Sequence, residues 1–129
     1  MFDEFRSVNP DIKIAWHSCG SITEIIPDFI EIGLDILNPL QPLAKDMTPE
    51  NLTEKYKNEL IFFGGIDIQE LLPHGTPEEI RKEVIRRAKI YGSWGNYIIA
   101  PAHNIQPDTP LENIFTFFDT VKELSSDNV

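Results

Sequence analysis

Four short runs of apolar residues recur along the chain, each bounded by glycine, proline, asparagine or aspartate. Runs of this kind are typical of strands that are buried on both faces of a parallel sheet. They cover residues 12–16, 35–40, 60–65 and 97–102. We therefore predict one strand at each of these places.

Helical patterns lie between these runs. Over residues 22–33 the apolar positions return to one face, Gly33 is a stop signal, and Pro27 predicts an early boundary or a kink. A second helix is predicted to begin at Thr48, because proline follows it directly. Both helices connect one predicted strand to the next.

The last two helices begin alike. In each, a threonine is followed at once by proline and, three positions after the threonine, by glutamate: Thr76, Pro77 and Glu79 in one, Thr109, Pro110 and Glu112 in the other. This spacing is that of a capping box, with proline at the first helical position. We therefore predict a capped helix start at both threonines.

The order of these elements predicts the fold class. Strand and helix alternate four times, after the end of a helix at residues 2–7, and such alternation indicates an α/β fold with a parallel sheet. An open doubly wound sheet and a (β/α)8 TIM-type barrel both fit this pattern. A whole barrel has eight units and typically about 250 residues, whereas this chain has 129. We predict a single partial-barrel domain over residues 1–129, equivalent to half a barrel.

Composition narrows the classes of function. The chain has 11 basic and 21 acidic residues, a net charge of −10, which disfavours nucleic-acid binding. No apolar run approaches the roughly 20 residues of a membrane helix, and the first residues are polar and acidic. A single cysteine excludes an internal disulfide. We expect a cytoplasmic protein that binds neither nucleic acid nor membrane.

Polar and glycine residues follow each predicted strand. In both candidate folds, ligand-binding residues gather at the carboxyl ends of the strands. The candidates, in strand order, are His17 and Cys19; Asn38 and Gln41; Gly64, Gly65 and Asp67; and His103 and Asn104. We expect these residues to converge on one rim.

Each candidate also has an ordinary structural interpretation. His17 and Cys19 share a face if both lie on a strand, which suits a pair of metal ligands, but a lone cysteine is commonly a small buried apolar residue. Asn38 precedes a proline and is typical of a turn. Asp67 is placed to cap the helix that follows it. The residue types alone leave these alternatives open.

The motifs "HSCG", "GLDILNPLQP", "FFGGIDIQELLPHGTPEEIRKEV" and "YIIAPAHNIQPDTPLENI", in this order, resemble the C-terminal half of the uroporphyrinogen decarboxylase superfamily. The resemblance runs from residue 12 to residue 124. It implies a (β/α)8 barrel, of which this chain holds four units. The superfamily contains uroporphyrinogen decarboxylases and methylcobamide-dependent methyltransferases.

The methyltransferase branch is our main hypothesis. Its thiol-methylating members bind zinc through a His-x-Cys pair and a later cysteine; His17 and Cys19 match the pair, and His103 stands where the third ligand falls. The resemblance then implies zinc-assisted methyl transfer from a corrinoid to a thiol. His103 and Asp67 are the candidate catalytic residues. The expected substrate contacts are Asn38, Gln41, Gly64, Gly65 and Asn104.

Two alternatives remain. In the decarboxylase branch, which removes tetrapyrrole carboxylates in porphyrin biosynthesis without a metal, His103 matches a histidine of the substrate pocket. The third interpretation is an inactive fragment or a binding subunit. For partners we expect a homodimer, because half a barrel leaves sheet edges and apolar surface open, and also a corrinoid protein or a separate N-terminal half.

Overall fold

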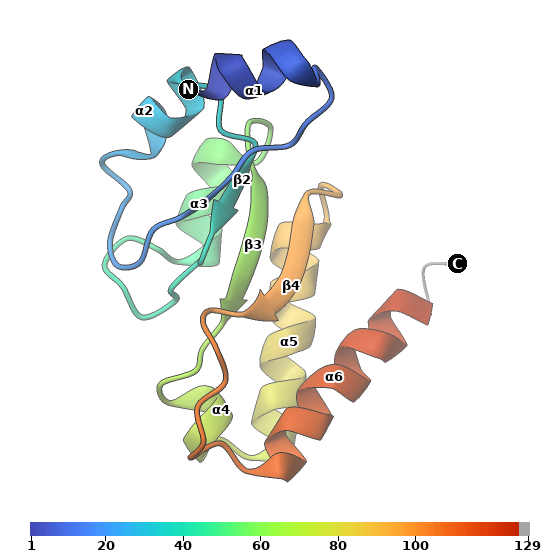
Figure 1. Cartoon of the computed structure of the whole chain (residues 1–129). Helices are drawn as coiled ribbons and strands as arrows, with labels where there is room; N and C mark the ends of the chain where they lie inside the picture. Colours follow the sequence, from blue (N-terminus) through green and yellow to red (C-terminus); the bar gives the residue numbers. More distant parts are fainter. Residues whose placement is uncertain (127–129) are drawn as a thin grey trace.

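The computed structural model describes residues 1–126 and contains one sheet of four parallel strands in the order β1-β2-β3-β4 (Figure 1). The strands are β1 (Ala15–His17), β2 (Ile36–Asn38), β3 (Ile61–Ile66) and β4 (Tyr97–Pro101). The helices are α1 (Phe2–Val8), α2 (Ile26–Glu31), α3 (Pro49–Tyr56), α4 (Leu71–His74), α5 (Pro77–Gly92) and α6 (Leu111–Ser126).

All four predicted strands are present, and neighbours along the chain are neighbours in the sheet. Helices connect each strand to the next, and α6 follows the last strand. This is the predicted α/β fold, a run of βα units of the kind that builds part of a barrel. The tail at residues 127–129, included in the predicted domain, lies outside the described residues.

β1 is shorter than the predicted strand over residues 12–16, and it begins at Ala15. The reason is the side chain of Asp35, whose carboxylate accepts the backbone N–H of Ile14 at 2.8 Å. That N–H is therefore not available for the ladder between β1 and β2. The same carboxylate pairs with Arg6 at 2.9 Å, so it ties α1 to the beginning of the sheet.

The helices cover one face of the sheet. Trp16, Leu37 and Phe62 lie in register on three adjacent strands, and side chains at matched positions of parallel strands point to the same side. Leu37 and Phe62 are almost fully buried. Their cluster also contains apolar residues of α1, α2, α3 and α5. The main core therefore lies between the sheet and these helices.

Within residues 1–126, no helix lies over the opposite face of the sheet (Figure 1). By the register of the strands, Ile36, Phe63 and Ile98 point to this face. Ile36 and Phe63 are half-buried, and Ile98 is 41% exposed. Among the described residues, β1 and β4 are the edges of the sheet, and each has one unpaired side. This face corresponds to the interior of a barrel.

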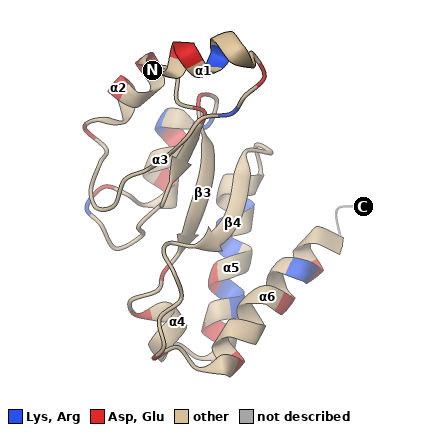
Figure 2. Cartoon of the chain, in the orientation of Figure 1, with Lys and Arg blue, Asp and Glu red and all other residues tan. Residues whose placement is uncertain are grey.

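The predicted capping box of α5 is confirmed. Thr76 accepts the backbone N–H of Glu79, and the Glu79 carboxylate accepts the backbone N–H of Thr76 at 2.8 Å. Charged residues of both signs lie along α5 (Figure 2), and Arg81 forms an ion pair with Glu123 of α6. No helix within residues 1–126 has the length and apolar character needed to cross a bilayer.

The predicted capping box of α6 is wrong. α6 begins at Leu111, and the buried Thr109 hydroxyl has no hydrogen-bond partner among the residues that the structure describes. The start of α6 is instead held by Asn113, whose side-chain amide donates to the carbonyls of Leu72 and Gly75, both at 2.8 Å. The packing of α6 against α4 thus overrides the local capping signal.

Pro27 lies at the start of α2, so of the two predicted effects, a boundary or a kink, the structure shows the boundary. α2 begins at Ile26, later than the apolar pattern that starts at residue 22, and Pro27 lies in its first turn. Gly33 follows the helix with a φ of +88°, a conformation that favours glycine. The predicted stop at Gly33 is therefore correct.

We predict that Asp35→Asn lowers the free energy of unfolding by about 1–2 kcal/mol at pH 7, because its hydrogen bonds are to charged or buried partners. Partial burial raises the pKa of Asp35. Hydrogen bonds from Ile14, Lys13 and Arg6 lower it by more than this, so that the pKa lies below the usual 3.8. A lowered folded-state pKa stabilises the fold above the unfolded value, and this contribution is lost as the pH falls through the folded value. Urea denaturation at pH 7 and pH 3 measures both effects.

The difference between wild type and Asp35→Asn should therefore shrink at pH 3. The exposed Asp108 provides the control, and Asp108→Asn should change little at either pH. An undiminished difference at pH 3 would show that the carboxylate does not act through its charge.

We also predict that the isolated chain self-associates, because the helix-free face carries Ile98 and two sheet edges are open. Light scattering should give a mass near twice the 14.8 kDa of one chain. Ile98→Lys should shift the mass toward the monomer, whereas Leu43→Lys, at an exposed site bordering α4 and α5, should not. A well-folded wild-type monomer at micromolar concentration contradicts this prediction.

Candidate functional site

The carboxyl ends of β1 and β2 bring an imidazole, a thiol and an amide together. His17 and Asn38 are paired in the register of the two strands. Nδ1 of His17 lies 2.7 Å from Oδ1 of Asn38, and Nε2 lies 3.3 Å from Sγ of Cys19. Cys19 lies beyond the end of β1, in the loop, and its thiol is exposed. The predicted association of His17 with Cys19 is therefore present, although only His17 is on the strand.

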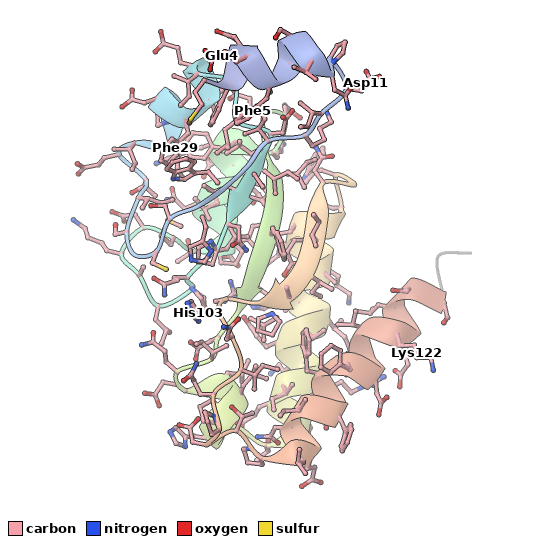
Figure 3. All side chains as sticks on the ribbon, viewed as in Figure 1. Glu4, Phe5, Asp11, Phe29, His103 and Lys122 are labelled. Atoms are coloured by element: carbon pink, nitrogen blue, oxygen red, sulfur yellow. The ribbon has the colours of Figure 1, made fainter. Side chains whose placement is uncertain are left out.

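His103 reaches the same place from the other edge of the sheet (Figure 3). β1 and β4 are separated by three strand spacings, which in a flat sheet amount to about 14 Å. Nevertheless the ring centroids of His17 and His103 are 6.0 Å apart, with the rings edge to face. The curvature of the sheet and the loop after β4 therefore bring both histidines to one rim.

The loop that carries Cys19 is held by the loop that follows β2. The backbone N–H of Gly20 donates to Oε1 of Gln41, and the hydroxyl of Ser21 donates to the carbonyl of Lys45 at 2.7 Å. Gln41 was predicted as a substrate contact. Its side-chain oxygen is instead engaged within the protein, where it fixes the position of the Cys19 loop.

Gly64 and Gly65 both have positive φ values, of +109° and +94°. A side chain at position 64 would place its Cβ 3.3 Å from the backbone nitrogen of Leu40 and 3.7 Å from Nδ2 of Asn38. Position 64 thus requires glycine both for its conformation and for the close approach of the backbone at Leu40, which follows β2. The role of the two glycines as substrate contacts stays a prediction.

Tyr97 is a support of the sheet that was not among the predicted site residues. Its hydroxyl donates to the carbonyl of Gly64 at 2.7 Å, and so links the first residue of β4 to a residue within β3. Burial raises the pKa of the Tyr97 phenol above its ordinary value of 10.0, so the hydroxyl stays protonated and remains a donor. No local signal marks this role, because it depends on the pairing of two distant strands.

Asp67 takes the capping role that was one of its two predicted interpretations. Its carboxylate is buried and accepts the backbone N–H groups of Gln69, Glu70 and Leu71, at 3.1, 2.8 and 2.8 Å. Within residues 1–126, no hydrogen bond joins Asp67 to either histidine of the rim. Asp67 also borders a groove beside α4 and α5. Its three hydrogen bonds are all to backbone N–H groups, which is the pattern of a residue that stabilises the start of a helix.

Asn104 follows His103 directly and is exposed. Its backbone carbonyl accepts the side-chain amide of Gln106 at 2.9 Å. The side chain of Asn104 has no hydrogen bond to the His17 and Cys19 pair among the described residues. Its assignment as a substrate contact therefore remains a prediction.

The pair formed by His17 and Cys19 fits two ligands of a zinc ion. With Zn–N and Zn–S bonds of about 2.0–2.1 and 2.3 Å, tetrahedral geometry places the two donor atoms roughly 3.5 Å apart, close to the 3.3 Å found here. No group of three or more histidine, cysteine, aspartate or glutamate side chains over residues 1–126 is arranged to hold a metal. A third ligand from this chain would require His103 to move closer.

Known proteins match this chain over most of its length. The uroporphyrinogen decarboxylase (URO-D) family matches residues 1–124. Uroporphyrinogen decarboxylases of Nostoc punctiforme and Trichormus variabilis are 26% and 36% identical over 97% of this chain and 33% of their own length. A methylated-thiol–coenzyme M methyltransferase of Methanosarcina mazei is 27% identical over 83% of this chain and 27% of its own length.

The chain thus spans about a third of the length of these relatives. The matched part is about the C-terminal third of those proteins. The order of the sequence motifs predicted this C-terminal position, but with the chain as one half of the barrel. The match also agrees with the four parallel βα units, which are part of such a barrel. By sequence and by fold, the chain belongs to the uroporphyrinogen decarboxylase (URO-D) family.

Proposed function

We propose that the chain forms the thiol-handling part of a methyltransferase of this family, which transfers a methyl group between a corrinoid and a thiol acceptor. The observation that carries the proposal is the contact of 3.3 Å between the thiol of Cys19 and Nε2 of His17. Both side chains are exposed on the rim, where an acceptor can reach them. A relative from Methanosarcina mazei, named as a methyltransferase for methylated thiols, supports the same interpretation.

His17 and Cys19 are the residues that would hold zinc, with His103 as the nearest further donor. When bound, zinc supplies a Lewis acid that keeps an acceptor thiol in its nucleophilic thiolate form. Cys19 contributes a soft sulfur ligand and His17 an imidazole nitrogen, the donor types that zinc prefers. Asn38 supports the ring of His17 from its other nitrogen.

His103 has a different role from the pair. Its ring is exposed and packs edge to face against His17. Beside His17 it is available to contact the acceptor or to complete the ligand set. Asp67 is left out of the proposed chemistry, because three backbone N–H groups occupy its carboxylate.

Uroporphyrinogen decarboxylation is the second candidate, and two of the three relatives named above carry this name, each matched over 97% of the chain. The relative from Trichormus variabilis that carries this name is 36% identical over 97% of the chain, against 27% over 83% for the methyltransferase. In this case His103 would contact the tetrapyrrole, and no metal would be involved. Cys19 would then have no part in the reaction, which distinguishes the two candidates.

Zinc content is the first test. We predict that the purified chain retains about one zinc ion after mild dialysis, as expected for a site that uses His17 and Cys19. Cys19→Ser should abolish retention, and His103→Ala should weaken it. The control is His74→Ala, at the end of α4, which should leave the zinc content unchanged.

Metal analysis by mass spectrometry measures all four proteins. Absence of zinc from the wild type, both as purified and after reconstitution, would contradict the methyltransferase proposal and favour the decarboxylase.

Activity is the second test. We predict that the isolated chain catalyses either reaction slowly or not at all. It spans about a third of its relatives, and its four βα units supply only half of the eight loops that form the rim of a barrel. Any residual activity should be demethylation of methylcobalamin by a small alkyl thiol, and Cys19→Ser should remove it. Both reactions are followed side by side, by corrinoid absorbance and by porphyrin fluorescence.

Formation of coproporphyrinogen at a rate unaffected by Cys19→Ser would establish the second candidate. Rapid turnover by the wild-type chain in either assay would refute the expectation that this chain alone is incomplete.

A further inference from the structure

Asn38 occupies a position from which it can control His17. It is the last residue of β2, half-buried, and in register with His17. Its side-chain amide has two partners. Nδ2 donates to the carbonyl of Phe63 on β3 at 3.3 Å, and Oδ1 lies 2.7 Å from Nδ1 of His17.

The contact with Phe63 fixes the direction of the amide. A backbone carbonyl oxygen only accepts hydrogen bonds, so the amide NH₂ must face Phe63. The amide oxygen then necessarily faces His17, and this oxygen also only accepts. Nδ1 of His17 must therefore carry the proton in the hydrogen bond that joins the two side chains.

This assignment determines the other nitrogen of the ring. In a neutral imidazole one nitrogen carries a proton and the other offers a lone pair. With the proton on Nδ1, the lone pair is on Nε2, which faces Cys19 Sγ at 3.3 Å. In the metal-free chain Cys19 can donate its S–H to this lone pair, and the nitrogen and sulfur lie side by side as two donors for one ion.

The surroundings of Asn38 hold it in this orientation. Its backbone carbonyl accepts the N–H of Ser18 at 2.8 Å, which ties β2 to the chain between His17 and Cys19. Gly64 lies beside the amide, where a Cβ at that position would come within ordinary contact distance of Nδ2, at 3.7 Å. Three strands thus meet at one amide group.

We infer that Asn38 is a positioning residue: it holds His17 as the Nδ1–H tautomer and aims the lone pair of Nε2 at the thiol of Cys19. This reassigns Asn38 from the predicted substrate contacts. The tautomer follows from the hydrogen bonds alone, whereas its use in binding a thiophilic metal ion rests on the proposed function.

The tautomer is tested on the metal-free full chain by long-range ¹H–¹⁵N correlation spectra of the histidine rings. At pH 8.5 an ordinary histidine is neutral, and the ¹⁵N shifts distinguish a protonated from an unprotonated nitrogen. We expect Nδ1–H for His17 in the wild type and a shift toward Nε2–H in Asn38→Leu. Asn38→Asp keeps an acceptor for Nδ1 and should keep the wild-type tautomer.

A matched control is Asn96→Leu. Asn96 also donates a side-chain amide hydrogen bond, to the carbonyl of Lys57 at 3.4 Å, but it precedes β4, at the opposite end of that strand from the rim. It should leave the spectrum of His17 unchanged. Folding of every variant is checked from the dispersion of the backbone amide signals, and Asn38→Asp still tests the inference if Asn38→Leu does not fold.

Titration with Co²⁺ tests the link to metal binding, because a thiolate ligand gives a charge-transfer band. Loss of a partner that orients a histidine ligand typically weakens metal affinity by about 10–100-fold, and we expect a loss in this range for Asn38→Leu and none for Asn96→Leu. If His17 shows Nδ1–H but Co²⁺ does not bind, the positioning role stands and the metal-dependent function fails. An Nε2–H tautomer in the wild type, or in Asn38→Asp, overturns the inference, as does an unchanged affinity in a folded Asn38→Leu.

Discussion

The parallel register between β1 and β2 is the constraint on which the site depends. It pairs Trp16 with Leu37 and His17 with Asn38. Leu37 is fully buried beneath the helices, so the next position on each strand must point to the other side. A slip of one residue would exchange the two faces. Burial of one apolar side chain thus fixes the side of the sheet on which the imidazole and the amide meet.

The loops after the strands then assemble the rim. The loop after β2 supports the loop after β1 through Gln41, and, further from the rim, Tyr97 of β4 is bonded to Gly64 within β3. Each support joins residues that are more than 20 positions apart in the chain. The rim therefore depends on how the strands pair. A change in strand pairing would move its side chains apart even if every loop kept its local conformation.

Sequence patterns predicted the local features of this fold well. The strands follow from apolar runs, and the start of α5 follows from Thr76 and Glu79, because these signals act within one turn. The meeting of His17, Cys19 and His103 was also predictable, since strand ends in such folds share a rim. The tie of Asp35 to Ile14, the support of α6 by Asn113 and the two bonds of Asn38 were not. All three are contacts between distant segments, for which a single sequence contains no local signal.

The convergence of His17 and His103 is the central claim, and it is tested most directly by nuclear Overhauser effects between their ring protons. The chain has three histidines, so the spectrum is simple, and His74 on α4 is an internal reference. Ring centroids 6.0 Å apart, edge to face, predict a cross-peak between His17 and His103. Resolved signals for both rings with no cross-peak between them would contradict the account.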